Sequence, residues 1–368
     1  MKRYGLTLLA AAAAGLTALH GDTPPGYTLQ WADEFDYTGA PDPSKWTHEI
    51  GAGGWGNNEV QVYTDSLDNS RVEEGRLIIE VRQTGEGRSP NYTSARLITR
   101  DKAEFKFGRI EARIKLPLET GTWPAFWMLA AEQTYGTQYW PDNGEIDVLE
   151  AVGYEQDPLF KNLAGDQQLP NVHGTIHTFQ RNGSDNTGLG GSTFLSDVSS
   201  EYHEYAINWS DGRIEWEVDG NVYFSLNRDD LLPSRNPPSD PWKWWPFDKD
   251  FFLILNVAVG GSWGGHFNSG FYPTDSPYGL DGIDHDGVWP QRMEVDYVRV
   301  YSAEPLDDPW NGPAPDASGY LQTDSWMGWI NVSNAPWIYS HNLNSYFLPT
   351  SVLEDEFRTD NQWIYIPR

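Results

Sequence analysis

The sequence predicts an all-β protein built as an antiparallel β-sandwich, and three observations lead to this fold class. Apolar and charged residues alternate strictly over residues 109–116, which is the period-two pattern of a strand with one buried face. Residues 214–218 and 222–224 are joined by Asp219-Gly220, a dipeptide that suits the tight turn of a β-hairpin. No long stretch after the N-terminal segment keeps a helical period, so a sandwich is favoured over βαβ units.

Further strands are expected at residues 76–82, 251–259 and 293–301, with glycine, proline, asparagine and aspartate between the strand segments. The chain of 368 residues is too long for one small domain. We therefore expect one large β-domain at residues 23–302 and an appendage after it.

Residues 1–22 are predicted to be a secretory signal peptide. A basic start at residues 1–3 is followed by an apolar run to about Leu19, which is too short for a membrane span. The alternative is a buried N-terminal helix, but the sequence GDTPP at 21–25 would break it. We expect a secreted protein, extracellular or at the cell surface.

The character of the chain changes after Tyr301. Residues 303–318 are rich in proline and acid, as a linker would be. Residues 319–368 form a small module whose core would be small and which carries four tryptophans, Trp326, Trp329, Trp337 and Trp363. Docking on the main domain, glycan binding and attachment all remain open as its role.

Composition excludes several classes of partner. The chain has no cysteine, so a disulfide framework and a thiolate metal site are impossible. A net charge of −28 opposes binding to nucleic acid, to an anionic membrane or to a polyanionic polysaccharide, although it could also serve solubility alone. The 18 tryptophans would suit a neutral polysaccharide, because sugar rings lie flat on indole.

The most informative segment is GEIDVLE at residues 144–150. In a regular strand Glu145 and Asp147 share one face, whereas Glu150 would point to the other. One extra residue, a β-bulge at Val148-Leu149, would return Glu150 to the face of the other two acids. Retaining glycosidases need two carboxyl groups about 5 to 5.5 Å apart, which such a strand can supply. An exposed acidic strand edge is the alternative for this pattern taken alone.

The flanking segments extend this pattern to a family resemblance, which covers residues from about 29 to 301. The matching segments are WADEFDY at 31–37, GGWGNNEVQVYT at 53–64, TSARLITR at 93–100, GTWPAFWML at 121–129, GEIDVLE at 144–150, HGTIH at 173–177, HEYAINW at 203–209, PFDKDFFLILNVAVGGSWGG at 246–265 and VDYVRVY at 295–301. Together and in this order they resemble glycoside hydrolase family 16, in particular its laminarinase-type endo-β-1,3-glucanases.

The resemblance implies a concanavalin A-like β-jelly-roll sandwich that cleaves internal bonds of β-1,3-glucan with retention. Glu145 matches the nucleophile, Asp147 the auxiliary acid and Glu150 the general acid/base. His177 matches the histidine beside the nucleophile, whereas His173 reads as an ordinary core or surface histidine. We expect a monomer whose partner is β-glucan and whose catalysis needs no cofactor.

The resemblance also implies binding residues. Trp123 and Trp127 match sugar-stacking walls, and Asn58 and Arg96 match polar groups on the glycone side. Trp140 and Trp263 are candidates for the cleft or the core. The resemblance also implies a structural calcium ion, and the positions that match its ligands are Glu34, Gly75 and Asp296. Backbone carbonyls and one carboxylate would supply the oxygen ligands that calcium prefers.

Competing functions remain open. A glucan-binding protein on the same scaffold would lack the catalytic acids, which this chain retains, and the strong negative charge disfavours the sulfated substrate of a carrageenase. An agarase would use a similar bulged strand, but the WPAFW and GGWGNNE segments favour a laminarinase. Lichenases of the family generally have E-x-D-x-E, so Leu149 argues against that type, although mixed-linkage β-1,3-1,4-glucan remains a possible second substrate. The HE pairs at 48–49 and 203–204 do not complete a zinc-protease motif.

Overall fold

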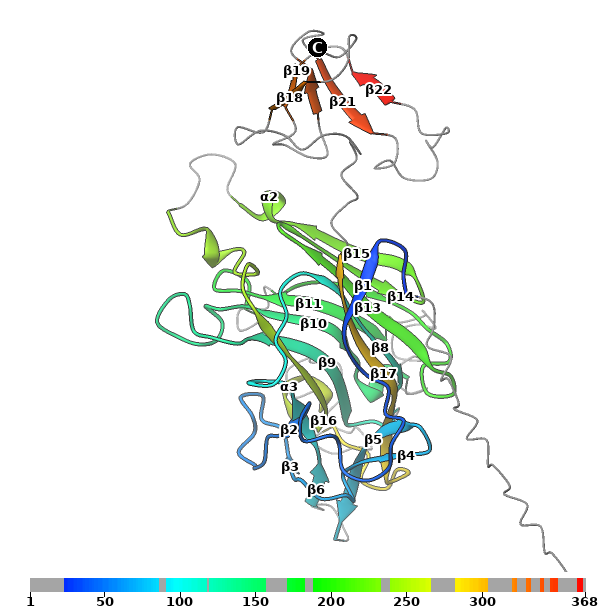
Figure 1. The fold of residues 1–368 in the computed structure, drawn as a ribbon. Helices are drawn as coiled ribbons and strands as arrows, with labels where there is room; N and C mark the ends of the chain where they lie inside the picture. Colours follow the sequence, from blue (N-terminus) through cyan, green and yellow to red (C-terminus); the bar gives the residue numbers. More distant parts are fainter. Residues whose placement is uncertain are drawn as a thin grey trace, which may run out of the picture.

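The computed structural model describes residues 23–85, 91–117, 119–156, 171–182, 188–232, 239–265 and 282–303, together with the backbone of five short strands between 320 and 366. In this part of the chain nearly all regular structure is β, and the longest helical segments have four residues (Figure 1). The all-β prediction is therefore confirmed. The predicted signal peptide and residues 304–318 of the predicted linker lie outside the described residues.

Two large sheets form the main body. The first has ten strands in the order β15-β14-β13-β8-β17-β5-β6-β3, with β1 joined to β17 and β4 to β5. Its strands are β15 (Asn221–Asn227), β14 (Arg213–Val218), β13 (His203–Ser210), β8 (Gly108–Lys115), β17 (Gln291–Ala303), β5 (Arg76–Thr84), β6 (Asn91–Ser94), β3 (Gln61–Tyr63), β1 (Tyr27–Asp33) and β4 (Ser70–Glu73). All its pairs are antiparallel except β3 with β6.

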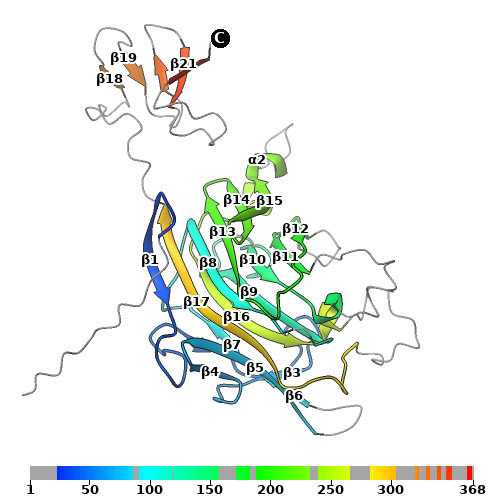
Figure 2. The same cartoon turned by 90° about the vertical axis from the view of Figure 1, so that its right-hand side faces the viewer.

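The second sheet carries the three acids of GEIDVLE on its third strand, β10. Its seven strands follow the order β12-β11-β10-β9-β16-β7-β2, and every neighbouring pair is antiparallel. They are β12 (Leu189–Thr193), β11 (Val172–His177), β10 (Glu145–Glu150), β9 (Thr122–Ala130), β16 (Phe251–Val259), β7 (Arg96–Ile98) and β2 (Thr47–His48). Long strands of both sheets curve together in Figure 2, and the main hydrophobic core lies between the sheets.

The β-hairpin prediction is confirmed. β14 and β15 pair antiparallel, and the turn between them places Asp219 at φ 50° and Gly220 at φ 75°. Positive φ at both turn residues matches the right-handed twist of the flanking strands, which is why this dipeptide is favoured there.

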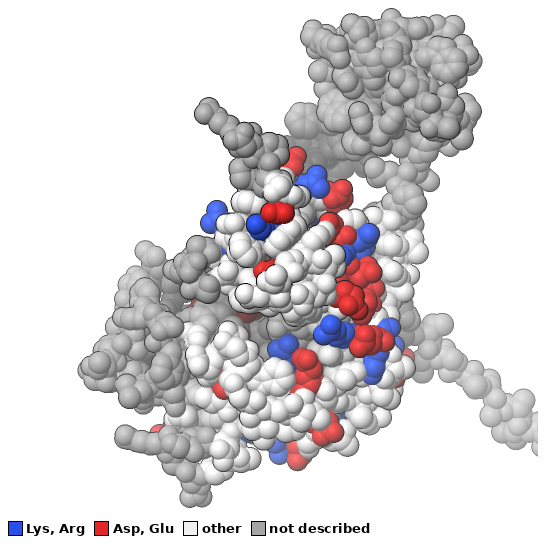
Figure 3. All heavy atoms as spheres, turned by 90° about the vertical axis from the view of Figure 1, so that its left-hand side faces the viewer, with Lys and Arg blue, Asp and Glu red and all other residues white. Residues whose placement is uncertain are grey.

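β8 differs from the half-buried strand that its alternation predicts. Its apolar side chains face the core, but Arg109 and Glu111 are also buried, at 6% and 2% exposure. Arg109 forms ion pairs with Glu111 at 2.6 Å, Glu204 at 2.7 Å and Glu217 at 2.5 Å, so neighbouring strands cover the charged face. Figure 3 shows basic and acidic side chains interleaved along one side of the molecule.

Five further strands form a separate antiparallel sheet in the order β18-β19-β20-β21-β22 (Figure 1). They are β18 (Tyr320–Gln322), β19 (Trp329–Asn331), β20 (Ile338–Ser340), β21 (Ser345–Pro349) and β22 (Trp363–Ile366). All lie within the predicted C-terminal module, whose boundaries and role stay a prediction.

Candidate active site

β10 carries the three acids on one face through a bulge. Asp147 lies opposite Trp127 of β9, but the next paired residue of β10 is Leu149, opposite Phe126, so Val148 is the extra residue. Ile146, Val148 and Leu149 all point into the core between the sheets. The bulge predicted at Val148-Leu149 is therefore confirmed, and Glu150 returns to the face of the other two acids.

A tryptophan of the opposite sheet holds this bulge from the core side. The indole Nε1–H of Trp216 on β14 donates a hydrogen bond of 2.8 Å to the main-chain carbonyl of Asp147, and both groups are buried. Gly174 of β11 leaves room for the indole, because a Cβ there would lie 2.2 Å from Cδ1 of Trp216. The bulge is thus held by a contact between the two sheets.

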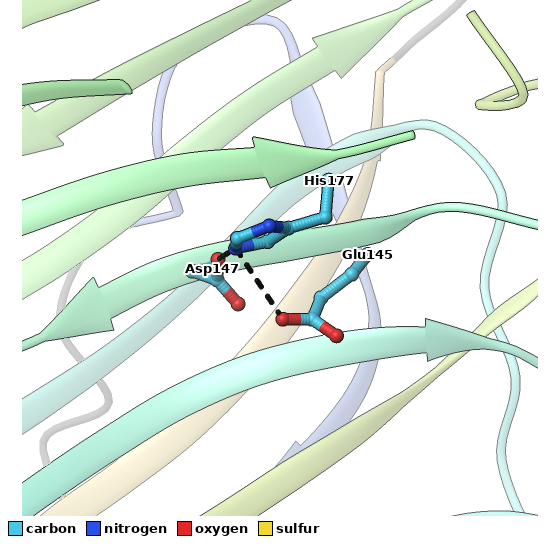
Figure 4. Close-up of side chains that lie close together, drawn as sticks. All are labelled: Glu145, Asp147 and His177. Carbon is cyan, nitrogen blue, oxygen red and sulfur yellow. Dashed lines mark ion pairs between the residues drawn. The ribbon is translucent and has the colours of Figure 1, made fainter. Parts of the chain in front are cut away.

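Glu145, Asp147 and His177 converge on the outer face of the sheet (Figure 4). Nε2 of His177 lies 3.2 Å from Oδ2 of Asp147 and 3.6 Å from Oε1 of Glu145. His177 reaches this position because it lies directly opposite Glu145 in the pairing of β10 with β11. The three groups lie within 4.8 Å of one another, so their spacing would also allow a metal ion.

Burial is the largest influence on the titration of the carboxyl groups. It raises the pKa of Glu150 to about 8, with repulsion from Asp147 adding to the effect. It raises the pKa of Asp147 to about 7, and the nearby charge of Glu145 adds to it. The pKa of Glu145 is also raised by burial, while the charge of His177 opposes the rise.

For the pKa of His177, burial and the nearby negative charges act in opposite directions. Burial alone would lower its pKa, but the charges of Glu145, Asp147 and Glu150 outweigh burial and raise it to about 10. At neutral pH the imidazole is therefore a cation beside Glu145, whereas Glu150 retains its proton.

Two tryptophans bind the outer glutamates directly. The indole of Trp140, which is 40% exposed, donates to Oε2 of Glu145 at 2.8 Å. The indole of Trp123 on β9 donates to Oε1 of Glu150 at 3.0 Å. Trp123 is expected to stack on sugar and Trp140 to lie in the cleft or the core, and the structure gives each a contact with one of the two acids.

The predicted glycone-side groups lie on β7, two strands from β9, and in the turn at residues 55–58. The Arg96 guanidinium on β7 stacks over the rings of Trp127 and Trp55, at 4.8 and 5.0 Å from their centroids. Nε1 of Trp127 donates to Oδ1 of Asn256 at 2.7 Å. Asn58 lies at φ 60° and donates to Oγ of Ser262 at 3.2 Å. Their substrate contacts stay a prediction.

Trp263 lies in α3 (Gly261–Gly264), next to Trp123. Its ring meets that of Trp123 edge-on at 5.6 Å and that of His173 at 5.0 Å. His173 lies opposite Glu150 in the register and pairs through Nε2 with Glu155 of η1 (Gly153–Gln156) at 2.9 Å.

Sequence reasoning does not single out Trp216, Asn256 or Glu155. Asn256 carries a usable signal, since it is the one polar residue in the nine-residue strand FFLILNVAV. Trp216 looks like any core residue of an alternating strand, and Glu155 has no distinguishing pattern. Their partners are distant in sequence or are set by tertiary packing.

The structure brings the predicted calcium positions together at one edge of β17. β5 pairs with residues 291–295 of β17, and β1 pairs with residues 298–303. Gly75 directly precedes β5 and Glu34 directly follows β1, so both lie near Asp296 in the pairing. The Glu34 carboxylate pairs with Arg299 at 2.7 Å, and Oδ2 of Asp296 with Arg113 at 2.7 Å. The two main-chain carbonyls and the second oxygen of Asp296 would be the ligands of calcium, and its binding stays a prediction.

Among the described residues, no helix has the length and apolar character needed to cross a membrane.

Comparison with known proteins gives consistent matches. Residues 55–244 match the model of glycosyl hydrolases family 16. A β-glucanase from Rhodothermus marinus is 45% identical over 282 residues, covering 76% of this chain and 87% of the relative. A glucan endo-1,3-β-glucosidase from Cryptopygus antarcticus is 36% identical over 286 residues, covering 75% and 92%. The X-ray structure of the laminarinase from Rhodothermus marinus matches with a TM-score of 0.63 and 43% identity, covering 76% of this chain and 98% of that chain.

Proposed function

Because the chain belongs to glycosyl hydrolases family 16, we propose that it is an endo-acting glycoside hydrolase that cleaves β-1,3-glucan with retention of configuration. The strongest structural support is the bulged strand β10, which presents Glu145, Asp147 and Glu150 on one face beside His177.

The reaction divides into two displacements. In the first, Glu145 attacks the anomeric carbon and Glu150 gives its proton to the departing glycosidic oxygen, so a glycosyl ester forms as the old bond breaks. In the second, Glu150 takes a proton from water, whose oxygen attacks the anomeric carbon and releases Glu145. The raised pKa of Glu150, about 8, supports its role as the acid of the first step.

We propose that Asp147 and His177 keep the nucleophile Glu145 ionised and balance its negative charge. The imidazolium lies 3.6 Å from Glu145 and 3.2 Å from Asp147, and its positive charge favours the ionised form of both. A carboxylate that stays ionised at the anomeric centre also stabilises positive charge that develops in the transition state.

Mixed-linkage β-1,3-1,4-glucan is proposed as a second substrate. We also propose that the protein acts as a monomer and is exported through residues 1–22, so that it meets polymeric glucan outside the cell. Cell fractionation tests export: the account requires the protein in the medium or at the cell surface.

A substrate panel tests the proposed activity. The purified protein is incubated with laminarin, mixed-linkage glucan, agarose and carrageenan, and reducing ends are measured. We expect the fastest release from laminarin, with oligosaccharides of several lengths as early products. Binding to laminarin without release of reducing ends would make the chain a glucan-binding protein, and preferential release from agarose or carrageenan would reassign the substrate.

A further inference from the structure

The loop between β9 and β10, residues 131–144, carries Trp140 and leads directly to Glu145. β9 and β10 pair antiparallel, and the loop of such a hairpin usually has about two to five residues. This loop is much longer, has no helix or strand of its own, and is exposed at residues 132–134 and 136–138. Long irregular loops in compact domains usually have a function.

A buried asparagine near the end of the loop binds its main chain. Asn143 is only 1% exposed, and its Oδ1 accepts hydrogen bonds from the main-chain N–H groups of Thr134 at 2.8 Å and Tyr135 at 2.7 Å. Its Nδ2 lies within hydrogen-bond distance of the carbonyl oxygens of Tyr135, Gln138 and Tyr139, at 3.1, 3.1 and 3.0 Å. One side chain thus binds both ends of the exposed segment.

Asp142, the neighbour of Asn143, holds the middle of the same segment. It is 3% exposed, and its Oδ2 accepts hydrogen bonds from the main-chain N–H groups of Thr137 at 2.8 Å and Gln138 at 3.0 Å. Gly136 permits this close approach, because a Cβ there would lie 1.9 Å from Oδ2 of Asp142. The two buried side chains therefore fix the main chain along most of the loop.

Trp140 depends on this main chain for its position. Its side chain is 40% exposed, so core packing does not hold it. The indole contacts the catalytic groups instead, through the hydrogen bond of 2.8 Å from Nε1 to Oε2 of Glu145 and a tilted ring contact with His177 at 6.1 Å. In the chain, Trp140 lies between the segment that the two buried side chains bind and those side chains themselves.

We propose that Asn143 and Asp142 are positioning residues for the hydrolysis, which fix the loop so that the Trp140 indole donates its hydrogen bond to the nucleophile Glu145. This inference rests on the proposed function. The two residues act through Trp140, whose donor stabilises the carboxylate that attacks the anomeric carbon.

The proposal has a consequence for the titration of the nucleophile. The hydrogen bond from Trp140 lowers the pKa of Glu145, against the effect of burial. Within the described residues, the charged groups that face this carboxylate come from the sheet and not from the loop: Asp147, Glu150, His177 and Arg96. Releasing the loop should therefore raise the pKa of Glu145, so the acid limb of the profile, where kcat/KM falls at low pH, should move to higher pH.

The test is a double-mutant cycle in kcat on laminarin, made from Asn143→Ala, Trp140→Phe and the variant with both changes. If Asn143 acts through Trp140, its removal matters only while the indole donor is present. Asn69→Ala is the matched control, because Asn69 is also buried, at 2% exposure, and its Nδ2 donates to the carbonyl of Glu80 on β5 of the first sheet at 2.9 Å. Gly136→Ala is a second loop variant, which disturbs the contact with Asp142 but keeps every buried polar group.

We expect Asn143→Ala to lower kcat about tenfold and to move the acid limb to higher pH. In the Trp140→Phe background the same change should lower kcat less than about twofold. Gly136→Ala should show the same pattern with a smaller loss, and it decides the test if Asn143→Ala does not fold. Asn69→Ala should lower Tm and leave kcat and the acid limb unchanged.

An equal loss of kcat in both backgrounds, or an acid limb that the loop variants leave unmoved, would overturn the proposal and make the two residues purely structural. Failure of the proposed function gives a different result, because the unmodified protein would then release no reducing ends from laminarin.

Discussion

Glu145 and Glu150 have the same side chain, and their contacts distinguish them. Glu145 accepts from Trp140 and lies 3.6 Å from the His177 imidazolium, which favours the ionised form. For Glu150, burial and the charge of Asp147 raise the pKa to about 8, so the carboxyl group keeps its proton at neutral pH. The sequence predicts which acids take part, whereas their protonation depends on neighbours that only the fold brings close.

These pKa directions predict a bell-shaped dependence of kcat/KM on pH. Activity falls above about pH 8 as Glu150 loses the proton that it must donate. It also falls in acid, where protonation of Glu145 removes the nucleophile, and burial raises the pKa at which this occurs. The profile is measured on laminarin in buffers of constant ionic strength. A profile that stays level from pH 6 to pH 10 would contradict the role given to Glu150.

Trp140→Phe tests the hydrogen bond to the nucleophile. The variant keeps an aromatic ring but loses the donor that stabilises the Glu145 anion, so kcat should fall about 10- to 100-fold, the range for a hydrogen bond to a charged group. The acid limb of the pH profile should move to higher pH. A rise in KM with unchanged kcat and pH profile would show that the ring serves only to stack sugar.

The bulge in β10 shows how far sequence reasoning reaches for one element. The spacing between Asp147 and Glu150 predicts the extra residue, because only a bulge returns the third acid to the shared face. The group that holds the bulge is Trp216, which is 69 positions away in the sequence. Likewise, the alternation of β8 predicts its core face but not the burial of Arg109, which depends on acids from β13 and β14.

Trp216→Phe should loosen this bulge. It leaves the buried Asp147 carbonyl without its donor, which should cost about 1 to 3 kcal/mol of the free energy of unfolding, and kcat should fall several-fold as the carboxylates shift. Trp209→Phe is the control, because its indole donates to the Phe247 carbonyl at 3.3 Å, away from the acids. Denaturant unfolding and kinetics on laminarin measure both effects. Equal kcat in the two variants would show that the contact serves stability alone.

At the scale of the whole molecule, the sequence predicts the sandwich but not every strand pairing. The sandwich follows from period-two strands and turn residues, and the jelly-roll type from the family resemblance. The parallel pair β3 with β6 could not be foreseen, because pairing between distant short strands is set by tertiary packing. For the C-terminal module the tryptophan content predicted an aromatic appendage, but not the order of its five strands.

Calcium at Glu34, Gly75 and Asp296 would tie β1 and β5 to β17, so its effect should appear in global stability. Saturation at a hundred times Kd adds about 2.7 kcal/mol, which should raise Tm by about 5 °C or more. We expect a chelator to lower Tm by this amount and added calcium to restore it. In Asp296→Asn the chelator should have a smaller effect. A Tm that the chelator leaves unmoved in the unmodified protein would remove the calcium proposal.

The most direct test of the central claim is the hydrolysis of laminarin by Glu145→Ser and Glu150→Ser, with laminarin binding measured on the same samples. Each substitution removes a reacting carboxyl group but leaves the tryptophan walls in place, so release of reducing sugar should fall about a thousandfold or more while binding persists. Glu201→Ser, at an exposed position outside the site, should behave as the unmodified protein. Undiminished hydrolysis by either of the first two variants would contradict the assignment of these glutamates as nucleophile and acid/base.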